Sequence, residues 1–241
     1  MILLKPSYHF EEGLFGDDAL ALIERAGRIC YKSEPKGNPK AFVRRRIRQG
    51  HESILEHAGF TVRFVVDRGI SHELVRHRLA SFSQESSRYV DYTGMKSDGH
   101  CQFIIPSWFG SEYEPGYWSH WERDIYRRVW RIEGSEPFYQ DVLLLPSNPI
   151  RMWLDAMLQA EAHYQALRRA QWIPQQARSV LPNSTKTEMF VTANIREWRL
   201  ILKQRTAHAA HPQMREVMIP LLKELRTRTP VLFEDIEGAP E

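Results

Sequence analysis

The stretch from which the fold and chemistry of this chain can be inferred covers residues 72–89 and reads HELVRHRLASFSQESSRY. Its first six letters approach the zinc-protease pattern H-E-x-x-H, in which two histidines four residues apart face one ion. Here His72 and His77 are five residues apart. On one helix this spacing turns the two rings about 140° away from each other. No cysteine or second histidine pair at zinc spacing accompanies them, so the sequence predicts no metal site.

The same stretch concentrates groups that bind anions. Arginine can hold a phosphate through two parallel N–H donors, and hydroxyl groups complete such a cradle. The groups concerned are Arg76, Arg78, Ser81, Ser83, Gln84, Ser86, Ser87 and Arg88. A solvated basic helix face followed by a polar loop would have the same composition. Composition alone therefore leaves a phosphate or nucleotide site and an ordinary surface both open.

The whole chain has the composition of a globular protein. It has 241 residues, 42% of them hydrophobic and 26% charged, and a net charge of +3, which suits small anionic ligands without demanding nucleic acid. Cys30 and Cys101 form no CxxC motif, which predicts a reduced, cytoplasmic protein. No signal-peptide pattern and no membrane-spanning apolar run is found, so we expect no membrane association. Short turn-rich stretches at 92–99 and 143–150 do not separate domains, and we expect one domain over residues 1–241.

Hydrophobic periodicity predicts a mixed helix and sheet domain of the α+β class, without Rossmann winding. We expect an apolar helix face of Leu74, Val75 and Leu79 on a helix capped by Ser71, and a loop after Ala80. The expected helices cover residues 17–30, 39–49, 71–79, 121–132, 150–171, 195–210 and 212–225, and the expected strands 60–67, 101–106 and 186–194. No glycine-rich phosphate loop is present, and neither cysteine has a signal for a lowered pKa. Difficult chemistry in this chain would therefore belong to a bound cofactor.

Three arginines in the second half form another candidate site. Arg178 lies in QARSVLPN, Arg196 follows the expected helix cap at Asn194, and Arg205 lies further along that helix. Because Arg196 and Arg205 are nine residues apart, they lie about 180° apart around the helix axis. One helix could thus meet two ligands or two subunits, although each arginine could equally be ordinary surface charge.

Residues 76–89, RHRLASFSQESSRY, closely resemble the R-H-R-x-x-S-x-x-x-x-S-x-R-Y signature of flavin-dependent thymidylate synthases. Residues 50–57, GHESILEH, resemble the family's G-H-x-x-x-x-E-H element. ARSVLP at 177–182 and NIREWRLILKQR at 194–205 resemble its A-R-x-x-L-P and N-x-R elements. The resemblance extends over about residues 15–225, with the elements in the family's order.

The resemblance implies reductive methylation of dUMP to dTMP. Methylenetetrahydrofolate would give the carbon, NADPH would reduce bound FAD, and the reduced flavin would deliver hydride without a cysteine nucleophile. It also implies a homotetramer with long helices that assembles through subunit interfaces, with FAD bound where subunits meet.

The same resemblance assigns roles to individual positions. His51 would lie near the flavin ring, Ser86 near the reacting base, and Arg205 against the uracil, favouring its N3-deprotonated form. The implied FAD contacts are Ser53, Arg76, His77, Arg78, Gln84, Asn194, Ile195, Arg196 and Leu200. The implied nucleotide contacts are Glu73, Leu74, Val75, Arg76, Gln84, Glu85, Ser86, Ser87, Arg88, Arg178 and Arg205.

Several positions depart from the family pattern. Leu200 replaces a frequent His or Asn on the flavin side, Gln175 lies where some members have Glu, and Glu73 lies where the family often has Gln. Residues around 108–146 form an insertion relative to short members, without an assigned role.

Three other functions remain possible on the sequence. One is a related flavin- and folate-dependent enzyme that methylates a different pyrimidine, with altered contacts around Glu73 and Arg178. A nucleic-acid-binding module would need a continuous basic face and would show steep salt dependence, whereas charge is nearly balanced here. A structural protein would leave the Arg/Ser cluster unexplained.

Overall fold

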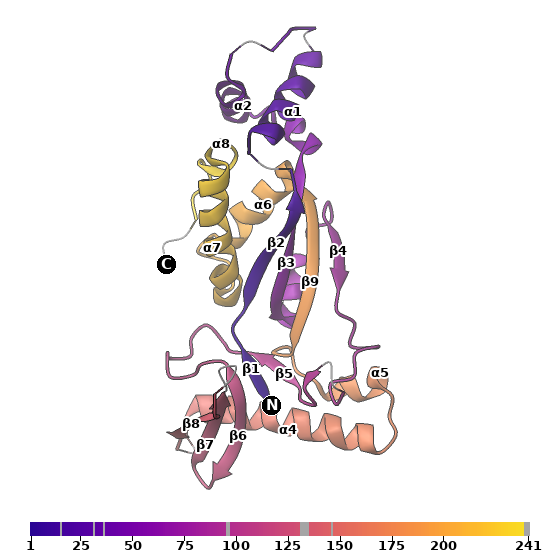
Figure 1. The fold of residues 1–241 in the computed structure, drawn as a ribbon, viewed down its shortest axis with the longest axis vertical. Coiled ribbons are helices and arrows are strands. Elements are labelled where there is room, and N and C mark those ends of the chain that lie inside the picture. The colour runs from indigo at the N-terminus through magenta and orange to yellow at the C-terminus, as the bar shows by residue number, and fades with distance from the viewer. Residues whose placement is uncertain are drawn as a thin grey trace. The chain divides into compact units, whose positions relative to one another are not determined.

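A computed structural model of the chain describes residues 1–14, 16–30, 32–35, 37–94, 97–130, 135–145 and 147–238. Two sheets with helices between their strands confirm the mixed α+β class without Rossmann winding (Figure 1). The chain divides into two compact units, each described by itself. Unit 1 contains Met1–Pro6, Val65–Ser71 and Gln84–Glu188, and unit 2 contains Ser7–Phe64, His72–Ser83 and Met189–Glu241. One domain over residues 1–241 stays a prediction.

Unit 1 is built on a five-stranded sheet with the order β5-β1-β6-β7-β8. The strands are β1 (Ile2–Leu4), β5 (Gln102–Ile104), β6 (Gly116–Glu122), β7 (Ile125–Trp130) and β8 (Phe138–Leu143). The helices are α4 (Pro149–Arg169), α5 (Pro174–Ala177) and the short 3-10 helix η3 (Arg178–Val180). Helix α4 begins where the Asn148 side chain accepts from the amide of Ile150 at 2.8 Å. Its Leu154 and Tyr164 join Trp118 and Tyr126 of the sheet in one apolar core.

Unit 2 holds most of a four-stranded sheet with the order β2-β3-β9-β4. Its strands are β2 (Ser7–Gly13), β3 (Gly59–Asp67), β4 (Ser81–Gln84) and β9 (Lys186–Asn194), of which the last three run into unit 1. Its helices are α1 (Gly16–Ile29), α2 (Pro39–Arg48), the 3-10 helix η1 (Glu52–His57), α6 (Ile195–Arg205), α7 (Pro212–Arg228) and α8 (Pro230–Phe233). Trp198 of α6 stacks on Phe60 of β3 with ring centroids 4.7 Å apart. This stacking fixes α6 against the sheet.

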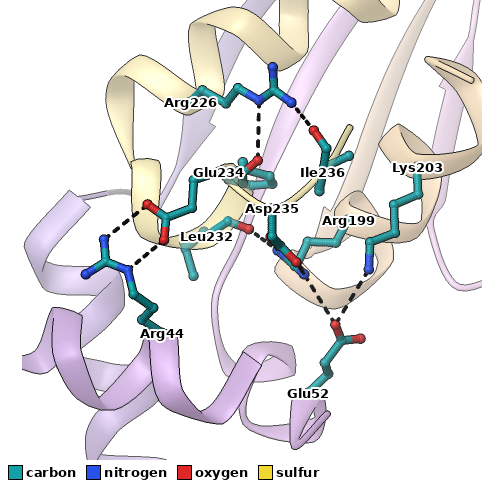
Figure 2. A network of polar contacts seen from close by, with 10 residues as sticks. Arg44, Glu52, Arg199, Lys203, Arg226, Leu232, Glu234, Asp235 and Ile236 are labelled. Carbon is teal, nitrogen blue, oxygen red and sulfur yellow. Dashed lines mark hydrogen bonds and ion pairs between the residues drawn. The ribbon is translucent and has the colours of Figure 1, made fainter. Parts of the chain in front are cut away.

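A polar network ties α6 to two other parts of unit 2 (Figure 2). Arg199 of α6 is fully buried and binds both carboxylate oxygens of Asp235 at 2.7 and 2.8 Å, and it also donates to the Leu232 carbonyl. Its Nη2 lies 3.4 Å from Oε1 of Glu52 in η1, and Lys203 Nζ lies 3.9 Å from the same oxygen. The start of η1 and the C-terminal segment are thereby both attached to one helix.

Several helix and strand predictions are confirmed closely. The sequence correctly located α1, α2, α4, α7, β3 and β5, and β9 has the predicted bounds. Asn194 caps α6 as expected, because its side chain accepts from the amide of Glu197 at 2.8 Å. Helix α6 ends at Arg205, so its predicted extension to residue 210 is wrong, and α8 was not predicted.

The predicted helix over residues 121–132 is wrong. The structure has the antiparallel pair β6 and β7 there, with Trp118 opposite Arg128 and His120 opposite Tyr126, while residues 131 and 132 lie outside the described part. Aromatic side chains that alternate between the core and the outer face satisfy a sheet, and helical spacing of the same residues misled the prediction. Strands β6 to β8 also occupy the range 108–146, of which residues 131–134 and 146 are not described, and its status as an insertion stays a prediction.

The predicted helix over residues 71–79 is also misplaced. Helix α3 (Arg68–Leu74) begins three residues earlier because the Asp67 carboxylate accepts from the amide of Ile70 at 2.7 Å, and Ser71 is not the cap. Val75 and Leu79 are exposed, at 37% and 79%, so they form no buried helix face. The first part of the predicted loop after Ala80 is instead the edge strand β4, whereas residues 85–90 lie in a loop as predicted.

Candidate active site

In unit 2 the predicted site residues gather at the two ends of α6. At its end, Arg205 donates from Nη1 to Oε2 of Glu73 at 2.7 Å and from Nη2 to the Glu73 carbonyl at 2.9 Å. Its Nε donates to Nε2 of His77 at 3.0 Å. Three predicted residues, Glu73, His77 and Arg205, are thus brought together, and we call them the Arg205 cluster.

His77 is a neutral part of this cluster. Burial and the neighbouring Arg205 charge lower the pKa of its imidazole to about 4. Because Nε2 accepts from Arg205, the ring proton lies on Nδ1, which is 3.6 Å from Oε1 of Glu197. Burial raises the pKa of the Glu197 carboxyl. His77 therefore orients Arg205, and its predicted contact with FAD stays a prediction.

A cavity of about 460 Å³ lies along the start of α6. Three residues predicted to contact FAD line it, namely Asn194, Arg196 and Leu200. Further lining comes from Glu52 and Glu56 of η1, from Leu79, and from Glu197, Arg199 and Lys203 of α6. Leu79 and Leu200 present apolar surface at 79% and 44% exposure, while Arg196 Nη1 binds Glu56 Oε1 at 2.6 Å.

The chemistry of this cavity fits a flavin ring. A planar heteroaromatic ring needs apolar surface against its faces and hydrogen-bonding groups at its edge, and the leucines and the charged residues provide both. The three cations of the lining are matched by three carboxylates, so the cavity suits a ring better than a pyrophosphate. Ile195 is buried in the start of α6. His51, directly before η1, and Ser53, within η1, are exposed, and their predicted flavin contacts stay predictions.

Unit 1 holds the segment predicted to bind the nucleotide, residues 84–88. Gln84 Nε2 donates to the hydroxyls of Ser71 and Thr187 at 2.9 and 3.1 Å. Arg178 Nη1 donates to the buried Ser87 hydroxyl at 3.1 Å, so these two predicted nucleotide contacts lie together. Ser86 is half-buried, and its hydroxyl accepts weakly from the amide of Arg88 at 3.3 Å.

Glu85 holds the middle of this segment. Lys186 Nζ binds its Oε2 at 2.9 Å and Glu188 Oε1 at 2.6 Å, and the Tyr92 hydroxyl donates to its Oε1 at 3.0 Å. The Glu85 amide also donates to the Glu188 carbonyl at 2.8 Å. Glu85 is thus turned into the protein and positions the segment.

The remaining predicted residues make fewer contacts. Arg76, Arg78 and Arg88 are exposed, and the guanidinium of Arg88 lies 5.5 Å from the centre of the Tyr89 ring. Leu74 is buried, which leaves its backbone as the part that could meet a ligand, whereas the Val75 side chain is exposed. Gln175 of α5 is exposed.

Sequence reasoning did not single out Glu197 or Lys186. Both are buried charged residues, and burial of this kind becomes visible once tertiary structure shows what covers them. The Cys101 thiol is buried as well, and burial raises its pKa to about 12, so it is a protonated thiol at neutral pH. Among the described residues, no group of three metal-binding side chains converges, and no helix is long and apolar enough to span a membrane.

Solved structures share this fold. The structure of a UMP/dUMP methylase, PolB, from Streptomyces cacaoi bound with 5-Br UMP superposes with a TM-score of 0.69 at 21% sequence identity, covering 96% of this chain and 94% of that one. A second structure of the same methylase, bound with 5-Br dUMP, gives a TM-score of 0.68 at 22% identity, covering 97% of this chain and 96% of that one.

Relatives known by sequence have a higher sequence identity to this chain than the two solved structures have. The family described as thymidylate synthase complementing protein matches residues 15–231. The flavin-dependent thymidylate synthase of Corynebacterium aurimucosum is 32% identical over 234 residues, which cover 95% of this chain and 83% of the relative. That of Corynebacterium efficiens is 33% identical over 225 residues, covering 91% and 80%. The chain belongs to the thymidylate synthase complementing protein family.

Proposed function

We propose that this protein is a flavin-dependent thymidylate synthase. The reaction converts dUMP, methylenetetrahydrofolate and NADPH, with one proton, into dTMP, tetrahydrofolate and NADP, and it uses FAD as hydride carrier. The observation that carries the proposal is helix α6, whose start lines a cavity suited to a flavin and whose end presents Arg205. Curated relatives at 32–33% identity are flavin-dependent thymidylate synthases, which supports the same assignment.

In this proposal, the start of α6 binds the flavin. Leu79 and Leu200 would cover the ring, while Asn194 and Arg196 would meet its polar edge. The bound flavin supplies hydride to the pyrimidine. The protein therefore needs no attacking thiolate, in agreement with the buried, protonated Cys101.

Each unit offers contacts of its own for a nucleotide, and the two sets are described separately. Arg178, Ser87 and Arg88 offer guanidinium and hydroxyl donors of the kind that bind a phosphate monoester. Arg205 would meet the carbonyl oxygens of the uracil ring, where a fixed cation polarises the base toward attack at carbon. We also propose a homotetramer in the cytoplasm, with ligands on two sides of α6.

A second candidate is an enzyme of the same chemistry that methylates a different pyrimidine nucleotide. The carboxylate of Glu73 favours it, because the family often has Gln there and because this carboxylate lies directly on Arg205. The UMP/dUMP methylase with the same fold makes UMP the natural alternative to test.

The deciding experiment is the visible absorption spectrum of the FAD-loaded protein, recorded before and after addition of dUMP or UMP. A flavin band that shifts at lower concentrations of dUMP than of UMP, followed by dTMP formation with the two co-substrates, would support the synthase. A band that responds to UMP in preference would support the second candidate. A protein that takes up no FAD would refute both.

A further inference from the structure

The positive charge of Arg205 is already paired in this protein. Its Nη1 lies 2.7 Å from Oε2 of Glu73, and the exposed fractions of the two side chains are 18% and 38%. The second bond, from Nη2 to the Glu73 carbonyl, fixes the guanidinium in the plane of this contact. The pair is thus held together at the edge of solvent, within reach of a ligand.

Both members of the pair keep hydrogen-bonding capacity. Arg205 uses one N–H each on Nε, Nη1 and Nη2, which leaves one N–H on each terminal nitrogen without a partner among the described residues. Oε1 of Glu73 likewise has no hydrogen-bond partner within the described ranges. The pair can therefore offer donors and an acceptor side by side.

No other charged group among the described residues contacts the Glu73–Arg205 ion pair. His77 stands behind Arg205 and is neutral, because the pKa of its imidazole lies at about 4. Glu197 lies behind His77, 3.6 Å from Nδ1. The other charged or titratable groups along this turn are His72, Arg76 and Arg78, which are exposed and have no ion pair within the described residues. Among the described residues, the Glu73 carboxylate is thus the charged group that contacts the Arg205 guanidinium, and the two charges balance.

We infer that Glu73 and Arg205 bind the uracil ring together in its N3-protonated form. Arg205 donates to a ring carbonyl oxygen, and the free oxygen of Glu73 accepts the N3–H. This inference rests on the proposed function, because it takes a uracil nucleotide as the ligand of Arg205.

The physical reason is the charge of the pair. An unpaired arginine against the ring would favour the N3 anion, since a nearby cation stabilises an anion. A carboxylate within hydrogen-bonding distance of N3 repels that anion and is stabilised by a proton donor. Glu73 therefore reverses the preference that the resemblance implies for Arg205 alone. It also makes this position a determinant of which protonation state of the base is bound.

The inference can be tested by fluorine NMR on FAD-loaded protein with 5-fluoro-dUMP and without folate, so that no turnover occurs. The fluorine shift reports N3 ionisation during a pH titration of the bound and the free nucleotide. We expect the bound N3 pKa in the unmodified protein to lie at or above that of the free nucleotide. In Glu73→Gln, which keeps the shape but removes the charge, the N3 ionisation constant should increase about tenfold or more, because Arg205 is then unpaired.

Glu11→Gln provides the matched control. Glu11 forms a carboxylate–guanidinium pair with Arg63 at 2.8 Å, with exposures of 33% and 35%, on strands β2 and β3. This variant should leave the bound N3 pKa unchanged. Glu73→Asp, which keeps the charge but shortens the side chain, should fall between the unmodified protein and Glu73→Gln, and flavin content checks that each variant is folded.

The outcomes separate this inference from the proposed function. A bound N3 pKa well below that of the free nucleotide in the unmodified protein would overturn the inference and leave the synthase proposal intact. The same holds for a Glu73→Gln variant whose N3 pKa equals that of the unmodified protein. If the FAD-loaded protein binds neither dUMP nor 5-fluoro-dUMP, both proposals fail.

Discussion

Replacing Asp235 by asparagine should destabilise the protein more than replacing its partner Arg199 by methionine. The two residues form a bidentate pair at 2.7 and 2.8 Å in the network of Figure 2. The side chain of Arg199 is 1% exposed, whereas that of Asp235 is 44% exposed. Asp235→Asn leaves a charged guanidinium buried without its main counter-ion. Arg199→Met leaves a carboxylate that water can still reach.

The expected magnitudes follow from this difference in burial. Removing one partner of a buried ion pair costs about 3–5 kcal/mol. Glu52 and the Leu232 carbonyl remain as partners of Arg199, and water screens Asp235, so we expect about 2 kcal/mol for Asp235→Asn. For Arg199→Met we expect at most about 1 kcal/mol, because methionine fills most of the buried volume without a charge.

Urea unfolding of the FAD-loaded protein at one fixed protein concentration measures these differences. Arg199 lowers the pKa of the Asp235 carboxyl, so the stabilisation by this carboxylate is fully present at neutral pH. It is lost as the pH falls below the ordinary range of an aspartate and through the lowered pKa. The gap between wild type and Asp235→Asn should therefore narrow in acid. An Arg199→Met variant that is equally or more destabilised, or a gap that stays constant with pH, would refute the reasoning.

Arg205→Ala should abolish most dTMP formation while FAD binding, followed by visible absorbance, survives; normal turnover would contradict the role of Arg205. Lys186→Met should raise KM for dUMP more than it lowers kcat, because it frees Glu85 within residues 84–88, and Lys186→Arg should restore KM. Asn194→Ala should cost about 1 kcal/mol in urea unfolding through loss of the α6 cap, and an unchanged midpoint would rule out this cap contribution. The double variant Cys30→Ala with Cys101→Ala should keep nearly full turnover, and a folded but inactive protein would indicate cysteine chemistry.

Local signals in the sequence located many elements of this fold. Asn194 before an amphipathic run predicted the start of α6, and the β-branched run after residue 59 predicted β3. The same kind of signal failed at β6 and β7, whose aromatic residues fit helical spacing as well as a strand. It failed again at α3, where Asp67 rather than Ser71 caps the helix. At β6 the pairing with β1, which is distant in sequence, selects the strand. At α3 two nearby side chains compete for the same helix start, and Asp67 makes the capping contact.

In the candidate site, too, some features could be predicted from the sequence and others could not. Its arginines and serines could be named because they match the signature of flavin-dependent thymidylate synthases in order and spacing. Their partners could not be named, since Glu73 and Arg205 are 132 residues apart and Lys186 and Glu85 are 101 residues apart.

The sequence by itself determined the α+β class, the Asn194 cap of α6 and the family to which the chain belongs. These properties depend on residues close together along the chain, or on a motif whose residue order and spacing identify the family. The tertiary structure alone decided that Arg205 is neutralised by Glu73 and oriented by a neutral His77. The protonation state of a side chain depends on its burial and on the charged neighbours that folding brings to it. The local sequence predicts neither the burial nor these neighbours.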